Sequence, residues 1–239
     1  MSGQGKLFII SAPPVFDLIS LRAIKALKQC DVILYDRLVN RQIVDLFDKE
    51  KIFVGKAPHR HSINQKEINM LIEKFLKKGK TVGRLKGGDA AVFSRVSEEI
   101  NIAYSLNAEV EWISGTTAAF IFSSFLKVPL TSRGVSDAVV FITGHPKQGG
   151  SIEEVYDWKA IVDLKATVVV YMGVENLETI AALLLKHGMK KEMPVAVGVD
   201  LGGRNHRVVF SSLSKVSEIK DKIESPAVII IGEVLKDVR

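Results

Sequence analysis

The chain is short of cysteine and of long apolar runs, and both shortages limit what it can be. Cys30 is the single cysteine among 239 residues, which excludes an internal disulfide framework and fits a reducing compartment. No apolar run approaches the roughly 18 residues of a membrane-spanning helix, and the first residues lack the basic and apolar regions of a signal peptide. We therefore expect a cytoplasmic protein with no membrane partner. Inside a predicted helix, Cys30 is expected to be a small buried hydrophobe rather than a nucleophile.

The sequence also lacks the short motifs of several common binding sites. It has no Walker A sequence, no CxxC and no HExxH, and the loop after the first predicted strand, residues 11–16, has no glycine, which argues against an ordinary Rossmann site. His59 and His61 form a pair, but no nearby acid or thiol completes a zinc site, so we expect a surface turn and no metal. The net charge of +6 favours anionic partners. No basic stripe is interleaved with aromatic residues, so a nucleic-acid partner is not expected.

What the sequence does contain, in its first half, is an alternation of apolar strands with helices. Five predicted strands alternate with four predicted helices, which indicates a mostly parallel sheet. The strands are residues 6–10, 31–35, 52–54, a strand that begins at Thr81, and 109–113; the helices are 18–29, 41–47, one after Ser62, and 94–105. Ser62 and Gln65 fit a capping box for the third helix. Its apolar stripe consists of Ile68, Leu71, Ile72, Phe75 and Leu76.

The second half predicts a different sheet. Its strands are residues 138–142, 167–171, 195–199, 207–210 and 227–231, with helices at 174–187 and 213–223. Only residues 200–206 separate the third and fourth strands, too few for a crossover helix, so this pair is expected to be antiparallel. The fold class is therefore two α/β domains, the first with a mostly parallel sheet and the second with a mixed sheet, with a cleft between them. We place the domains at residues 1–113 and 138–239, joined by the connecting segment 114–137.

The stretch from Thr81 to Phe93 reads as a strand that runs into two glycines, an acid and a helix. Ligands in open α/β sheets collect at the carboxyl ends of the strands, and Gly87 and Gly88 would let the backbone approach one closely. Asp89 would then accept hydrogen bonds from a ligand or from the backbone. An ordinary turn whose Asp89 caps the next helix is the alternative. From the residues alone, the prediction is a two-domain enzyme with a cleft for an anionic small molecule.

Beyond these general features, the sequence resembles the tetrapyrrole methylases in a series of short motifs. Their order and spacing agree over nearly the whole chain. The motifs are Tyr35–Val39, Val54–Lys56, His61–Ser62 with Gln65–Asn69, Arg84–Asp89, Phe93 with Glu98–Glu99, Pro129–Gly134, Phe141–His145, Val169–Gly173, Pro194–Ala196, and Ser225–Ala227 with Ile231–Glu233.

This resemblance implies a methyltransferase that uses S-adenosylmethionine as donor and releases S-adenosylhomocysteine. The most similar branch of the family methylates uroporphyrinogen III at C2 and C7 to give precorrin-2, for sirohaem or cobalamin. The resemblance also implies a homodimer, with the cofactor folded between the domains. Matched motif by motif, the cofactor-binding residues would be Pro13, Gly87, Gly88, Asp89, Val92, Thr117, Ala118, Met172 and Leu201. Asp36 would be a proton acceptor and Lys56 a proton donor.

The residue types suit that chemistry. The sulfonium methyl group is already activated, so the enzyme mainly has to align an electron-rich pyrrole carbon with it. The carboxylates of the substrate would suit Arg37, Arg84 and Arg133, as well as Lys56. Asp36 would steer pyrrole N–H groups or take up a proton; the alternative is a helix N-cap.

The sequence departs from the family pattern in several loops. The first loop is usually Gly-Ala-Gly-Pro-Gly-Asp, whereas here Ser11–Val15 contains neither glycine nor acid. Ala90 and Ala91 replace Pro-Phe, Ser94–Ser97 replaces Gly-Arg-Gly-Gly, Ser132 replaces a common histidine, and Leu201 replaces a small residue. Added side chains narrow loops that would face cofactor or substrate. Two alternatives therefore stand beside the main prediction: a relative with another methyl acceptor, and a catalytically silent tetrapyrrole-binding protein.

Overall fold

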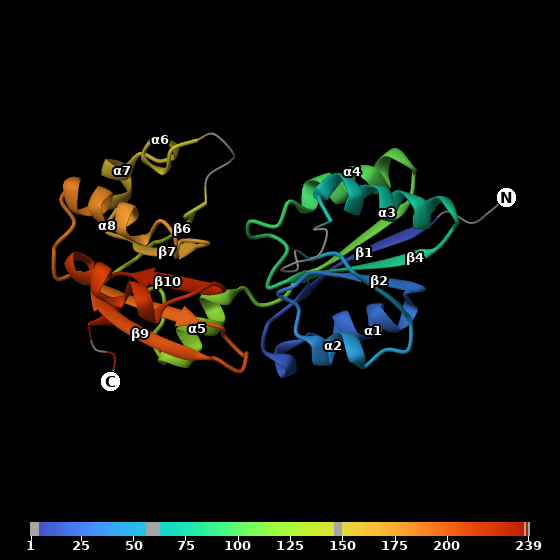
Figure 1. Ribbon diagram of the computed structural model, residues 1–239, viewed down its shortest axis with the longest axis horizontal. Helices are drawn as coiled ribbons and strands as arrows, with labels where there is room; N and C mark the ends of the chain where they lie inside the picture. The colour runs from blue at the N-terminus through green and yellow to red at the C-terminus, as the bar shows by residue number, and fades with distance from the viewer. Residues whose placement is uncertain (1–4, 56–62, 146–149, 237, 239) are drawn as a thin grey trace. The chain divides into compact units, whose positions relative to one another are not determined.

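The chain forms two compact units, each built around its own five-stranded sheet (Figure 1). The structure is a computed structural model that describes residues 5–55, 63–145, 150–236 and 238. The first unit is Met1–Ala118 and the second is Ala119–Arg239. Two α/β units, one with a parallel sheet and one with a mixed sheet, are the fold class that the sequence predicts.

The first unit has a parallel sheet in the order β3-β2-β4-β1-β5. Its strands are β1 (Lys6–Ala12), β2 (Val32–Tyr35), β3 (Glu50–Phe53), β4 (Thr81–Gly87) and β5 (Glu109–Ile113). Strand β1 is buried on both faces from Leu7 to Ala12, as expected for a central strand covered by helices on both sides. All five strands therefore end at the same edge of the sheet.

Helices cover both faces of this sheet. Helices α1 (Leu21–Gln29) and α2 (Arg41–Asp45) pack on one face, where Phe8 and Ile10 point. Helices α3 (Gln65–Lys77) and α4 (Val96–Ser105) pack on the other, against Leu7 and Ile9 (Figure 1). Alternate residues of β1 thus enter opposite cores, as the strand period of two requires. A short 3-10 helix, η1 (Phe16–Leu18), precedes α1.

The start of α3 corrects one prediction. Its N-cap is Asn64, not Ser62: the Asn64 side chain accepts the Glu67 N–H at 3.0 Å, and the Glu67 carboxylate accepts the Asn64 N–H at 2.7 Å. The capping box is therefore the pair Asn64 and Glu67 rather than Ser62 and Gln65. The predicted apolar stripe is confirmed: Ile68, Ile72, Phe75 and Leu76 are buried in the core, and Leu71 is partly buried against it.

The second unit has a mixed sheet in the order β6-β7-β10-β8-β9. Its strands are β6 (Val139–Thr143), β7 (Thr167–Tyr171), β8 (Pro194–Val199), β9 (Arg207–Ser212) and β10 (Ala227–Ile231). Strands β6 and β7 are parallel, whereas β10 runs antiparallel to β7 and to β8. The expected antiparallel pairing of β8 with β9 is confirmed.

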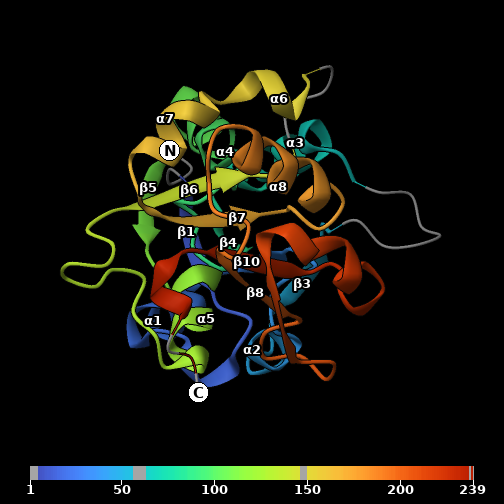
Figure 2. The ribbon, with the colours of Figure 1, turned by 90° about the vertical axis from the view of Figure 1, so that its left-hand side faces the viewer.

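Helices also cover both faces of the second sheet, and α8 and α5 lie on opposite faces (Figure 2). One face carries α6 (Ile152–Val155), α7 (Trp158–Asp163), α8 (Leu177–Lys186) and η2 (Leu213–Lys222), and α5 (Ala118–Leu126) packs on the other. The Phe122 ring of α5 lies 2.6 Å from where a Cβ of Gly198 would stand, so a side chain at residue 198 would displace the helix. A last 3-10 helix is η3 (Glu233–Leu235).

The helices of the second unit differ from the sequence analysis in two respects. The segment predicted as a helix over 213–223 is a 3-10 helix with non-helical backbone angles at Lys215. The short helices α6 and α7 are not predicted, because four and six residues are too few to show a period. Among the residues described, no helix has the length and apolar character needed to cross a membrane.

Candidate functional site

The carboxyl ends of the parallel strands in the first unit bring together most of the predicted site residues. Pro13 follows β1, Asp36 follows β2, Gly88 and Asp89 follow β4, and Thr117 follows β5. Ligands of open parallel sheets bind at this edge, where the loops leave the strands. Pro13 and Thr117 are buried, whereas Gly88 and Asp89 are half-buried.

Asp89 ties two of these loops together. Its Oδ1 accepts the Ala91 N–H at 2.7 Å, and its Oδ2 accepts the Gly115 N–H at 2.8 Å. The Gly88 N–H is donated to the Ala12 carbonyl at 2.7 Å. Both carboxylate oxygens therefore bond backbone donors, so Asp89 holds the ends of β4 and β5 in place. Asp89 thus accepts hydrogen bonds from the backbone, as the first of its two expected roles allows. The alternative, a cap on the next helix, is wrong, because α4 begins at Val96 and its N-cap is Arg95.

The two glycines of this loop meet different requirements. A Cβ on Gly87 would lie 2.5 Å from the Leu38 Cβ, so Gly87 lets the loop after β2 pass close to β4. Gly88 has a φ of +78°, and within the described residues nothing lies within 4 Å of its potential Cβ. The backbone at Gly88 therefore borders open space in a left-handed conformation that favours glycine. Val92, whose N–H donates to the Asp89 carbonyl, closes the turn.

The altered first loop makes its own contacts with the Gly-Gly-Asp loop. Ser11, at 1% exposure, accepts the Ala90 N–H on its Oγ at 3.0 Å. Its Cβ lies 2.7 Å from where a Cβ of Gly115 would stand, so Ser11 needs glycine at that position. The hydroxyl thus supplies an acceptor that a glycine at position 11 would lack. After β2, the Asn40 side chain donates to the Pro14 carbonyl at 2.8 Å, which holds the other end of this loop.

Asp36 lies beside a buried cluster of charged side chains. The Arg84 Nη2 is 2.6 Å from the Asp36 Oδ1, and the Arg84 Nε is 3.0 Å from the Glu99 Oε1. The Lys86 Nζ lies 3.0 Å from the same Glu99 oxygen and 4.0 Å from the Asp36 Oδ2. The side chains of Arg84 and Glu99 are 1% and 0% exposed, and that of Asp36 is 27% exposed. Asp36 is therefore the member of the cluster that reaches solvent.

Burial acts differently on the two cations. It disfavours the charged form of Arg84, but the neighbouring Asp36 and Glu99 outweigh it and raise the pKa of the guanidinium. Burial lowers the pKa of the Lys86 ammonium, the positive charge of Arg84 lowers it further, and Glu99 and Asp36 offset this only in part. The surroundings thus favour the charged form of Arg84 and disfavour the charged form of Lys86.

The remaining predicted site residues are more scattered. Arg37 is exposed after β2, and Ala118 is half-buried at the end of the first unit. Lys56 lies outside the described residues. Arg133, Met172 and Leu201 belong to the second unit.

Within the second unit, each of these three sits in a turn. Arg133 is exposed in a turn closed by a bridge between Ser132 and Ser136. Met172, at the end of β7, has a φ of +52° and a side chain that is 48% exposed. Leu201, between β8 and β9, is only 7% exposed, so its added volume is packed into the protein.

The charged cluster contains residues that the sequence analysis did not assign to the site, namely Lys86 and Glu99, with Gln65 beside them. One signal was available. Glu99 lies three residues after Val96 and four before Ala103, so it occupies the buried stripe of α4. A carboxylate on such a stripe requires a buried partner.

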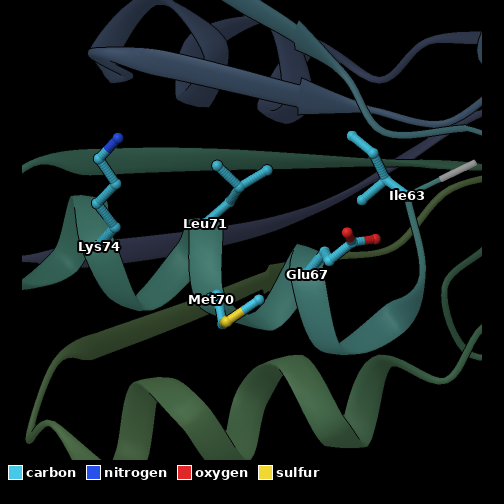
Figure 3. A pocket seen from close by; sticks show the side chains of 5 residues that line it. All are labelled: Ile63, Glu67, Met70, Leu71 and Lys74. Carbon is cyan, nitrogen blue, oxygen red and sulfur yellow. The ribbon is translucent and has the colours of Figure 1, made fainter. Parts of the chain in front are cut away.

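A shallow pocket of about 300 Å³ lies on the outer side of α3 (Figure 3). Its lining side chains are Ile63, Glu67, Met70, Leu71 and Lys74. They come from one helix and the residue before its cap, and none is a predicted site residue. The strand ends, not this pocket, therefore form the candidate site.

Comparisons with known proteins agree on one family, the tetrapyrrole methylases. The family model for tetrapyrrole (corrin/porphyrin) methylases matches residues 6–217. The siroheme synthases of Escherichia fergusonii and Photorhabdus laumondii are each 37% identical over 235 residues. That alignment covers 97% of the chain but 50% and 49% of the two relatives, so the chain spans about half the length of these curated relatives.

Solved structures match this chain over nearly the whole length of both chains compared. Uroporphyrin-III C-methyltransferase from Thermus thermophilus, complexed with S-adenosylhomocysteine, is 32% identical with a TM-score of 0.82, covering 97% of this chain and 99% of that one. Its native form gives 31% and 0.81, covering 97% and 93%. A cobalt precorrin-4 methyltransferase has a TM-score of 0.84 at 21% identity over 97% and 96%, which shows the shared fold.

Proposed function

The chain belongs to the tetrapyrrole methylase family, and we propose that it methylates uroporphyrinogen III at C2 and C7 with S-adenosylmethionine to give precorrin-2. The observation that carries this proposal is the 32% identity over 99% of a uroporphyrin-III C-methyltransferase. The product serves sirohaem or cobalamin biosynthesis. We further propose that the protein works as a homodimer in the cytoplasm, without a membrane or nucleic-acid partner.

The residues at the strand ends of the first unit fit the proposed cofactor. Gly88 supplies backbone that borders open space, where a Cβ would intrude, and Asp89 fixes the loop that carries it. We assign cofactor contacts to Pro13, Gly87, Gly88, Asp89, Val92, Thr117 and Ala118 in the first unit, and to Met172 and Leu201 in the second. Bound S-adenosylmethionine supplies a methyl group already activated by the sulfonium.

The task left to the protein is alignment and proton transfer. As the pyrrole carbon bonds to the methyl carbon, the C–S electron pair returns to sulfur and a ring N–H loses its proton. Asp36, partly exposed at the end of β2, is assigned to accept that proton, and Lys56 to donate one. Arg37 and Arg133, whose side chains are exposed, are assigned to the substrate carboxylates. Arg84 is buried with its donors on protein acceptors, which favours the different role argued below.

The test of the reaction is product mass. Purified protein, enzymatically made uroporphyrinogen III and S-adenosylmethionine, mixed without oxygen, should give a product two methyl groups heavier. No mass change under conditions in which a known enzyme works would contradict the proposal. Calorimetry then separates the alternatives: S-adenosylhomocysteine binding without turnover indicates another acceptor, and no binding at millimolar ligand indicates a silent relative.

Two matched glycine variants test the cofactor loop. Gly88 and Gly188 both have positive φ, at +78° and +102°, and neither has described atoms within 4 Å of a potential Cβ. Gly88→Ala and Gly188→Ala should therefore carry a similar strain, about 1 kcal/mol. Only Gly88→Ala should weaken S-adenosylhomocysteine binding in calorimetry, by about tenfold or more, since its methyl enters the proposed site. Equal affinity in the two variants would remove Gly88 from that site.

A further inference from the structure

Four separate motifs of the sequence converge on one buried polar cluster in the first unit. Asp36 comes from the end of β2, Arg84 and Lys86 from β4, Gln65 from the first turn of α3, and Glu99 from α4. Only Asp36 among them has a role in the reaction proposed above. The cluster therefore raises the question of what the other four residues do.

Glu99 is the centre of the cluster. Its side chain is 0% exposed. Its Oε1 accepts hydrogen bonds from the Arg84 Nε at 3.0 Å, the Lys86 Nζ at 3.0 Å and the Gln65 Nε2 at 3.2 Å. Its Oε2 is buried and has no partner within the described part of the chain. Oε1 thus accepts three hydrogen bonds. Oε2 accepts none from the described residues, and leaving a buried acceptor unsatisfied costs free energy.

The guanidinium of Arg84 is fixed from three directions. Nε is held by Glu99, Nη1 donates to the Leu85 carbonyl at 2.9 Å, and Nη2 donates to the Asp36 Oδ1 at 2.6 Å. A guanidinium is planar, so fixing two of its nitrogens in the interior determines the direction of the third. That third nitrogen points at the one carboxylate of the cluster that reaches solvent.

We propose that Arg84, oriented by Glu99, is a positioning residue that fixes the Asp36 carboxylate for its part in methyl transfer. This inference rests on the proposed function, in which Asp36 accepts a proton. Arg84 then acts through Asp36 and does not contact the substrate carboxylates itself.

Fold stability alone does not account for this arrangement. Burying two cations and two anions is costly, and apolar side chains of similar volume in such a place are often as stabilising or more so. The lowered pKa of Lys86 and the Glu99 Oε2, which accepts no hydrogen bond from the described residues, show that part of this cost persists. Precise positioning of the Asp36 carboxylate explains why the charges are there, since a catalytic group must be held within a fraction of an ångström.

A surface ion pair of the second unit provides the control. The Arg207 Nη2 lies 3.0 Å from the Glu224 Oε1, and the two side chains are 39% and 60% exposed. The test variants are Glu99→Gln and Arg84→Lys, and the matched controls are Glu224→Gln and Arg207→Lys. Each pair makes the same chemical change, once inside the cluster and once at the surface.

The first readout is the kinetics of methyl transfer. We expect Glu99→Gln and Arg84→Lys to lower kcat by about 10-fold to 100-fold, the usual effect of a misplaced catalytic group. KM for S-adenosylmethionine should stay within about twofold, because the cofactor contacts are unchanged. The controls should match wild type in both. A merely structural role would lower Tm and leave kcat per folded molecule unchanged, which would overturn the inference.

The second readout does not depend on activity. Crystal structures of wild type, Glu99→Gln and Glu224→Gln should show the Asp36 carboxylate displaced or disordered in Glu99→Gln and in its wild-type place in Glu224→Gln. An unmoved carboxylate overturns the inference, whatever the kinetics. If wild type transfers no methyl group to uroporphyrinogen III, the proposed function fails and these structures still decide the role of Arg84. If Arg84→Lys does not fold, the near-isosteric Glu99→Gln decides both readouts.

Discussion

Cys30 and Gly83 show how one side chain limits what its neighbour can be. Cys30 is 1% exposed, and its Sγ lies 2.7 Å from where a Cβ of Gly83 would stand. Burial raises the pKa of the Cys30 thiol to about 12, so the reactive thiolate is scarce at neutral pH. Cys30 is therefore a core side chain, as predicted, and its sulfur occupies the space that keeps Gly83 a glycine.

A double-mutant cycle tests this contact. Gly83→Ala alone should lower the free energy of unfolding by about 1–3 kcal/mol, because the new methyl overpacks against the sulfur. In Cys30→Ala/Gly83→Ala the sulfur is gone, and the nearest remaining atoms are at 3.5 and 3.6 Å, an ordinary contact distance. The double variant should therefore lose less stability than the sum of the single variants in urea denaturation. Strict additivity would show that the two residues do not compete for one space.

The candidate site residues differ in how far the sequence alone predicts their placement. The position of Asp36, Gly88 and Asp89 at the strand ends was predictable, because they follow apolar strands of a parallel sheet and such strand ends share an edge. The burial of Arg84 was not, since it depends on Glu99 fifteen residues later and Asp36 forty-eight residues earlier. Sequence spacing along β4 places Arg84 in a strand but does not reveal the helix carboxylate that receives it.

At the scale of elements, long periodic segments were predictable and short ones were not. Helix α3 has thirteen residues and a broad apolar stripe, whereas α6 has four residues. The N-cap of α3 shows a second limit: Ser62 with Gln65 and Asn64 with Glu67 both fit a capping pattern. Only the backbone hydrogen bonds of the folded helix select Asn64.

Strand β5 shows how charges can protect the edge of a sheet. Glu111 on this edge strand bonds the Arg22 Nη2 and the Lys6 Nζ at 3.0 and 3.1 Å, and Lys6 also pairs with Glu109 at 2.7 Å. Hydrogen bonds from Arg22 and Lys6 lower the pKa of the Glu111 carboxyl. Charged side chains on an edge strand discourage pairing with another chain.

The lowered pKa of Glu111 predicts a pH dependence of stability. A carboxyl whose folded pKa is below its unfolded value adds stability above the unfolded pKa, about 4.3, and loses it as pH falls through the folded pKa. Glu111→Gln should therefore cost up to about 1 kcal/mol at pH 7, less in high salt. The difference from wild type should vanish at low pH in urea titrations. Glu218→Gln, at an exposed position of η2, is the control. A pH-independent cost of Glu111→Gln would contradict the ion-pair account.

At the scale of the whole molecule, the chain has two units, each with its own sheet and its own hydrophobic core. In the part of the chain that the structure describes, the strands of each sheet pair only within their own unit. Ile10 is fully buried in the first unit and Ile229 in the second, each within its own apolar cluster. Trp112 lies in the first unit and Trp158 in the second. Units with their own sheet and core are able to fold as separate cooperative blocks.

Matched core truncations test this independence. Ile10→Ala and Ile229→Ala should each remove about 2–5 kcal/mol from the unit that carries it, because each leaves a cavity in a fully buried site. Amide hydrogen exchange followed by mass spectrometry should then show faster exchange in the strands of that unit and wild-type protection in the other. Loss of protection in both units from either variant would mean that the chain unfolds as a single block. Since the strand ends of the first unit carry Asp36 and the Gly-Gly-Asp loop, Ile229→Ala should leave that edge as protected as in wild type.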